Sequence, residues 1–85
     1  MASRREKLRA KIEQGPRHVR FEDLSKLLQA YGFEMCRPSK GSHYYYVRGR
    51  YQISVPYRRP HVLPVYVRRA LVLIDQAESE ENSDG

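Results

Sequence analysis

The chain has 85 residues, and its 16 lysines and arginines outnumber its 10 aspartates and glutamates, giving a net charge of +6. This length supports one small domain with a modest core, and the basic balance favours a polyanionic partner, nucleic acid first of all. A lone cysteine, Cys36, excludes an internal disulfide and a thiol pair for zinc or redox chemistry. The longest strongly apolar run, 70–74, is too short to cross a bilayer, so we expect a cytoplasmic protein.

Two helices are predicted in the first part of the chain. Residues 3–14 carry Leu8 and Ile12 four positions apart and are followed by Gly15, a stop signal. This pattern predicts a helix with a narrow apolar stripe, which we expect to lie outside the main core. A stronger helical spacing follows, and Gly32 supplies the left-handed residue that ends it. The apolar positions of this second helix are Phe21, Leu24, Leu27, Leu28 and Tyr31.

The apolar period then changes from 3.6 to 2, which predicts three short strands at 33–37, 42–48 and 51–55. The second connector is only Gly49-Arg50, short enough for a tight hairpin, so we expect an antiparallel meander. Pro56 ends the third strand.

A closing helix is predicted from Pro64 to near Ala77, after a proline-interrupted loop. Its apolar positions follow helical spacing at Val67, Ala70, Leu71 and Ile74. Four of the ten acidic residues lie in the last eight positions, which we interpret as a disordered acidic tail.

The predicted fold class is therefore α+β: a three-stranded antiparallel sheet with two helices on one face, in the order α-β-β-β-α, plus an extra N-terminal helix. This layout is that of the double-stranded-RNA-binding domain. We divide the chain into an N-terminal helical extension (1–18), the main domain (19–77) and the acidic tail (78–85).

His43 is the residue best suited to catalysis. Histidine can both accept and donate a proton near neutral pH, and RNA carries its own nucleophile, the 2′-hydroxyl beside the scissile phosphate. One histidine with neighbouring cations can therefore cleave RNA without a metal ion. The alternative is that His43 is an ordinary strand residue beside a glycine turn.

Strand parity decides whether a substrate could reach His43. His43, Tyr45 and Val47 share one face, whereas Tyr44 and Tyr46 share the other. If Tyr44 and Tyr46 enter the core, His43 lies on the open face. If Tyr45 and Val47 are buried instead, His43 points inward, and the sequence leaves both possibilities open.

Several residues near His43 are candidate RNA contacts. Gly41 permits close approach of a phosphate backbone, Ser42 offers a hydroxyl, and Tyr45 could stack on unpaired bases. His61 could be a second proton carrier, although a plain loop residue is the better interpretation. A basic rim would be formed by Lys40, Arg58, Arg59, Arg68 and Arg69, whose alternative interpretation is a solvated surface.

Other chemistries lack their residues. The sequence contains no glycine-rich phosphate loop followed by Lys-Ser/Thr, no HExxH motif, no Cys-x-x-Cys motif and no carboxylate pair near His43. We therefore expect no metal and no cofactor.

The chain resembles the HicA (YcfA-like) toxins of bacterial type II toxin–antitoxin systems over residues 19–77. The resemblance is carried by LSKLLQAYGF at 24–33, EMCR at 34–37, KGSH at 40–43 and ISVP at 53–56. It implies a small mRNA-cleaving endoribonuclease of double-stranded-RNA-binding-domain fold, which needs no metal and is neutralised by a HicB-like antitoxin. The histidine of its Gly-Ser-His motif, here His43, would be the catalytic residue.

Two departures limit the resemblance. The connector before Ser42 is one residue longer than the usual form, and 57–64 does not match the family's P-R-H-P-G-K pattern, so the role of the family's second histidine does not carry over to His61. The first hypothesis is a ribonuclease toxin. The alternatives are a non-catalytic RNA-binding module, and a domain that exists mainly to be covered by an acidic partner protein.

Overall fold

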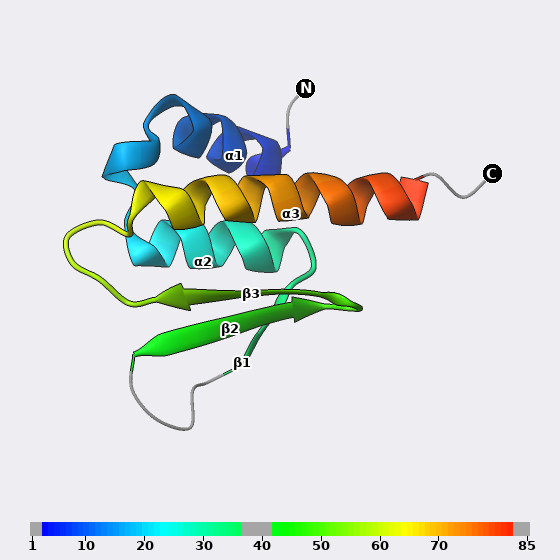
Figure 1. Ribbon diagram of the computed structural model, residues 1–85. Coiled ribbons are helices and arrows are strands. Elements are labelled where there is room, and N and C mark those ends of the chain that lie inside the picture. The colour runs from blue at the N-terminus through cyan, green and yellow to red at the C-terminus, as the bar shows by residue number, and fades with distance from the viewer. Residues whose placement is uncertain (1–2, 37–41, 83–85) are drawn as a thin grey trace.

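The computed structural model describes residues 3–36 and 42–82 (Figure 1). These residues form an α+β structure with a three-stranded antiparallel sheet and three α-helices, as the sequence predicts. In chain order the elements are α1 (Arg4–Gln14), the 3-10 helix η1 (Pro16–His18), α2 (Phe21–Ala30), β1 (Glu34–Cys36), β2 (His43–Arg48), β3 (Tyr51–Pro56) and α3 (Pro64–Asn82).

Local signals set the ends of the first two α-helices. Ser3 caps α1, because its hydroxyl accepts a hydrogen bond from the backbone of Glu6 while the Glu6 carboxylate accepts from the Ser3 backbone. Acidic residues occupy the first turn of α2, where they complement the helix dipole. Gly32 follows α2 with φ of 90°, a conformation that only glycine adopts readily.

The sheet has the order β1-β2-β3, with both pairings antiparallel. The β2–β3 hairpin turns through Gly49-Arg50, and Gly49 has φ of 58°, which suits a tight two-residue turn. Beyond the strands, the Tyr57 backbone amide donates a 2.7 Å hydrogen bond to the Ser42 carbonyl and so continues the pairing. β3 lies at one edge of the sheet, with β2 as its neighbour among the described strands.

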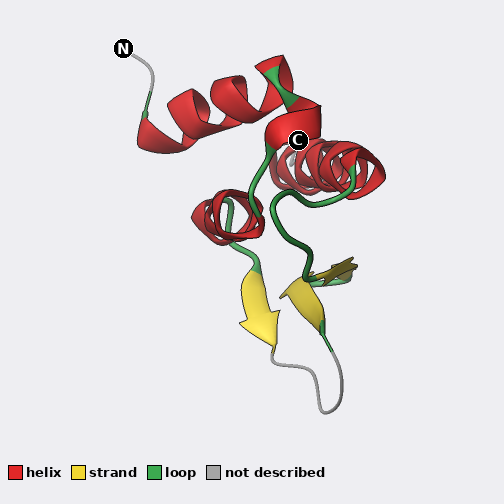
Figure 2. Cartoon of the chain, turned by 90° about the vertical axis from the view of Figure 1, so that its left-hand side faces the viewer, coloured by secondary structure: helices red, strands yellow, loops and turns green. Residues whose placement is uncertain are grey.

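One face of the sheet is covered by helices and the other is not. α2 and α3 lie against the same face, α1 lies outside them, and no described helix lies on the opposite face (Figures 1 and 2). The core between these layers contains Leu24, Leu27, Leu28, Phe33, Tyr46, Val55, Val67 and Ile74 among other buried residues. Ile12 of α1 is also buried, so the N-terminal helix adds to the core, although most of its surface is exposed.

The predicted end of the closing helix near Ala77 is wrong, as is the prediction of a disordered tail from residue 78. α3 continues to Asn82, and residues 83–85 lie outside the described part of the chain. Two of the acidic side chains expected to be free in solvent have partners: Glu78 accepts a 2.8 Å hydrogen bond from Arg48, and Glu80 accepts a 2.9 Å bond from Arg50.

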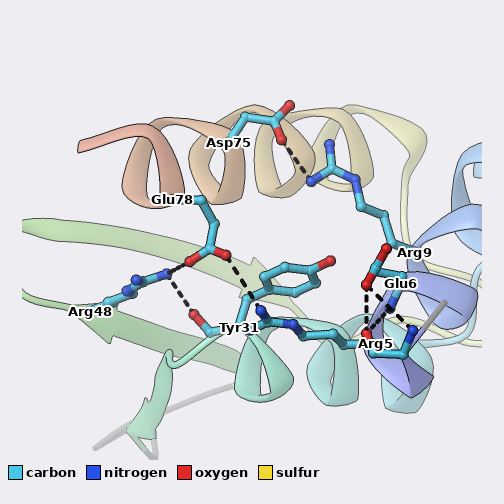
Figure 3. Close-up of polar contacts among 8 residues, drawn as sticks. Arg5, Glu6, Arg9, Tyr31, Arg48, Asp75 and Glu78 are labelled. Carbon is cyan, nitrogen blue, oxygen red and sulfur yellow. Dashed lines mark hydrogen bonds and ion pairs between the residues drawn. The ribbon is translucent and has the colours of Figure 1, made fainter. Parts of the chain in front are cut away.

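Polar contacts join the helical layers above the sheet (Figure 3). Arg48 donates to both Glu78 and the carbonyl of Tyr31, so one guanidinium ties β2 to α3 and to the end of α2. Arg9 of α1 binds Asp75 of α3 at 2.7 Å, and this hydrogen bond raises the pKa of Arg9. Within the described residues, no helix combines the length and apolar character that a membrane span needs.

Candidate nucleic-acid interface

His43 is the first residue of β2 and its side chain is exposed. It pairs with Pro56, the last residue of β3, and lies one pair inside the Ser42–Tyr57 hydrogen bond. The backbone of His43 is thus held between two paired positions at the end of the sheet.

The face that His43 occupies follows from its tyrosine neighbours. The ring of Tyr44 packs against Phe21 of α2 with a centroid separation of 5.0 Å, and Tyr46 is buried in the core. Because side chains alternate along a strand, His43 and Tyr45 point to the face that no described helix covers. Of the two arrangements that the sequence left open, the structure has the one that exposes His43.

Tyr44 and Tyr46, which face the helices, differ from the exposed Tyr45 in what they could do. The Tyr46 hydroxyl donates to Ser25 Oγ at 2.8 Å, and burial raises the pKa of Tyr46 despite this bond. Tyr46 is thus a core residue, and Tyr44, which is partly buried, packs against the core. Tyr45 is 45% exposed and lies between Ser54 and Cys36 on the neighbouring strands, so its ring is accessible for stacking.

Arg58 and Arg59 leave the sheet at the end where His43 lies, immediately after Tyr57. Together with Arg20 and Glu22 at the start of α2 they line a shallow groove of about 360 Å³. Arg59 donates a 2.5 Å hydrogen bond to the hydroxyl of Tyr57, and this bond raises the pKa of Arg59. Arg20 was not identified from the sequence, because it precedes the helix and nothing in the local pattern links it to the distant loop.

Arg68 and Arg69 lie on the exposed side of α3 and not beside Arg58 and Arg59. They line a separate groove of about 560 Å³ between α3 and the edge of the sheet, which includes Ser54 of β3. The guanidinium of Arg69 lies 5.7 Å from the ring centroid of Tyr66. The predicted basic rim is therefore divided between two grooves.

His61 packs against His18, for which we predicted no role from the sequence. Its ring meets that of His18 edge-on, with 5.4 Å between the centroids. The next residue, Val62, is buried, and its amide donates a 2.9 Å hydrogen bond to the carbonyl of Val19. These contacts hold His61 against η1, in keeping with its interpretation as a loop residue.

Two predicted contact residues, Lys40 and Gly41, lie outside the described residues, and Ser42 is exposed in the turn that leads into β2. Within 3–36 and 42–82, no group of three or more histidine, cysteine, aspartate or glutamate side chains is placed to hold a metal ion.

Comparison with known proteins adds no assignment: no family model, no curated protein and no solved structure matches the chain.

Proposed function

We propose that the chain is a HicA-like toxin, a metal-independent endoribonuclease that cleaves mRNA through His43. The observation that carries the proposal is the exposure of His43 on the uncovered sheet face, with Tyr45 beside it. The α-β-β-β-α order is compatible with a double-stranded-RNA-binding-domain-like fold, which we propose together with the activity. A HicB-like antitoxin is the proposed protein partner, and the cytoplasm is the proposed location.

The proposed reaction needs one proton acceptor and positive charge. The imidazole of His43 would take the proton of the ribose 2′-hydroxyl, whose oxygen then forms a bond to phosphorus as the bond to the 5′-oxygen breaks. The leaving 5′-oxygen would take up a proton from the imidazolium or from water. The proposed source of positive charge for the phosphate is Arg58 and Arg59, which follow β3 at this end of the sheet but line a groove with Arg20 and Glu22 that does not include His43.

The test is cleavage of a long single-stranded RNA in excess EDTA by the wild-type protein and by the variants His43→Ala and His18→Ala. We expect discrete fragments from the wild-type protein and from His18→Ala, and a loss of at least about 100-fold in rate for His43→Ala, the usual contribution of a general base. His18→Ala is the matched control, because it removes a histidine that lies in η1 and not on the sheet that carries His43.

RNA binding by His43→Ala, measured in parallel, separates a catalytic role from a binding role. Full cleavage by His43→Ala would overturn the site assignment. Intact RNA with every form, despite salt-dependent binding, would favour the non-catalytic RNA-binding module.

A further inference from the structure

The outer edge of β3 carries backbone hydrogen-bonding groups that no strand of the described chain meets. The Tyr57 amide bonds to the Ser42 carbonyl, so this pair is a hydrogen-bonded one, and hydrogen-bonded and non-bonded pairs alternate along an antiparallel ladder. Val55, Ile53 and Tyr51 therefore direct their amides and carbonyls toward β2. Gln52 and Ser54 direct theirs outward, and Pro56 adds an outward carbonyl.

These outward groups border an apolar groove. Gln52 and Ser54 form one wall of the groove of about 560 Å³, and α3 forms the other. On the same side of α3, Val65 is 42% exposed and Val72 is 55% exposed. A strand added at this edge would form main-chain hydrogen bonds with β3, and its side chains would contact the exposed valines.

The positive charge of the groove favours an acidic side chain on the added strand. Among the described residues that line it, Arg68 and Arg69 carry the charge, and both lie between Val65 and Val72 along α3. The nearest carboxylate on the helix, Asp75, lies beyond Val72 and is bound to Arg9. An incoming segment that places one acidic side chain between two apolar ones therefore complements the groove.

Spacing fixes the pattern of such a segment. Val65 and Val72 are about 10 Å apart along α3 at 1.5 Å per residue. Same-face residues of a strand recur about every 7 Å, so residues four apart, about 13 Å, are the shortest same-face pair that spans both valines. Every second residue of an added strand faces the helix. The matching pattern is apolar-x-acidic-x-apolar.

A second copy of the chain fits the edge less well. α3 lies over β3 (Figures 1 and 2). If the β3 of a second copy paired with this edge, the two α3 helices would lie about one strand spacing apart. Paired strands are about 5 Å apart, whereas packed helices need about 8–10 Å between their axes. A lone extended segment has no such helix above it.

We propose that the β3 edge and the exposed side of α3 form a docking groove for an extended acidic segment of a partner protein, which adds a fourth strand to the sheet. The groove does not include His43, so this proposal does not depend on the ribonuclease activity.

The test uses the capped peptide acetyl-Thr-Val-Thr-Glu-Thr-Val-Thr-amide and amide hydrogen exchange of the full chain. Saturating peptide should slow exchange of the Gln52 and Ser54 amides by at least about tenfold, because both become hydrogen-bonded. The variant Val72→Asp should weaken peptide binding by about tenfold or more, since it removes apolar contact and adds like charge. The same peptide with lysine in place of glutamate is the charge control.

Each other outcome decides against the proposal. It fails if the peptide leaves the Gln52 and Ser54 amides unprotected at about millimolar concentration, or if the lysine peptide binds equally well. Protection that rises with protein concentration in the absence of peptide would assign the edge to a second copy. Val72→Asp should still cleave RNA at the wild-type rate if the proposed function is right, so a failure of either proposal is visible separately.

Discussion

The hydroxyl of Tyr46 donates a 2.8 Å hydrogen bond to Ser25 Oγ and so joins the central strand to α2 inside the core. Ser25 Oγ also accepts a 2.9 Å bond from the side-chain amide of Gln29, so the buried hydroxyl of Ser25 is satisfied from both elements. This arrangement turns the Tyr44–Tyr46 side of β2 inward and leaves His43 and Tyr45 outside.

The buried hydroxyl of Tyr46 predicts a loss of stability in alkali. Burial raises the pKa of Tyr46, so above the ordinary tyrosine pKa of about 10 the unfolded chain releases a proton that the folded chain retains. The stabilisation is complete below that pH and is lost as the pH rises past it. Urea unfolding of Tyr46→Phe should show about 1 kcal/mol lower stability at neutral pH and a shallower decline above pH ~10. If stability fell equally steeply with pH in the wild-type protein and in Tyr46→Phe, the prediction would be wrong.

The positive φ of Gly32 predicts that a side chain at this position lowers the stability of the fold. An alanine there would have to adopt φ of 90°, although the atoms nearest to its Cβ would belong to the Arg48 side chain at 3.5 Å, an ordinary contact. We expect Gly32→Ala to lower the free energy of unfolding by about 1–2 kcal/mol through backbone strain. Gly15→Ala, at φ of −139° with open space around the new Cβ, should change it by less than about 0.5 kcal/mol. Similar losses in both variants would show that strain is not the cause.

Glu78 predicts a stabilising role for the C-terminal part of α3. Its carboxylate accepts from Arg48 at 2.8 Å, and both side chains are largely shielded, with 27% and 20% exposure. Glu78→Ala should lower the free energy of unfolding by about 1–2 kcal/mol, because it removes a carboxylate partner of a shielded guanidinium. As a control, Glu13→Ala removes an exposed contact with Arg9 and should cost less than about 0.5 kcal/mol. Denaturant unfolding of both variants measures the difference.

The attachment of α1 predicts a dependence on salt. α1 contacts α3 through the Arg9–Asp75 and Arg5–Glu78 ion pairs, and Arg5 lies over the ring of Tyr31 at 4.7 Å. Raising the salt to about 1 M shortens the screening length to about 3 Å, so amide exchange in α1 should accelerate by a few fold. Amides in α2, whose helix is held by apolar packing, should change less. Equal acceleration in both helices would indicate global destabilisation instead.

Most of the fold could be predicted from local pattern. The leucines of α2, the glycine that follows it and the short Gly49-Arg50 turn are signals within a few residues, and the structure confirms the elements they predict. The end of α3 could not be predicted in this way. Its acidic residues are stabilised by Arg48 and Arg50, about thirty positions earlier, and only the folded chain brings them together.

The candidate site was predictable in its residues but not in its geometry. His43 and Tyr45 stand out in the sequence, yet their exposure depends on Phe21, which packs against Tyr44 from another element. The basic residues were predicted as one rim, whereas the fold divides them between two grooves. Arg20 and His18 gained neighbours that only tertiary structure provides.

The hydrogen bond between Ser42 and Tyr57 has a consequence for binding entropy. Because pairing continues one step past His43, the backbone of this residue is already ordered before any ligand arrives. Fixing the backbone of one flexible residue costs about 1–2 kcal/mol, and this cost does not reduce the free energy of binding of a ligand that contacts His43. Only the two side-chain torsions of the imidazole remain to be fixed, so the histidine is preorganised by the sheet.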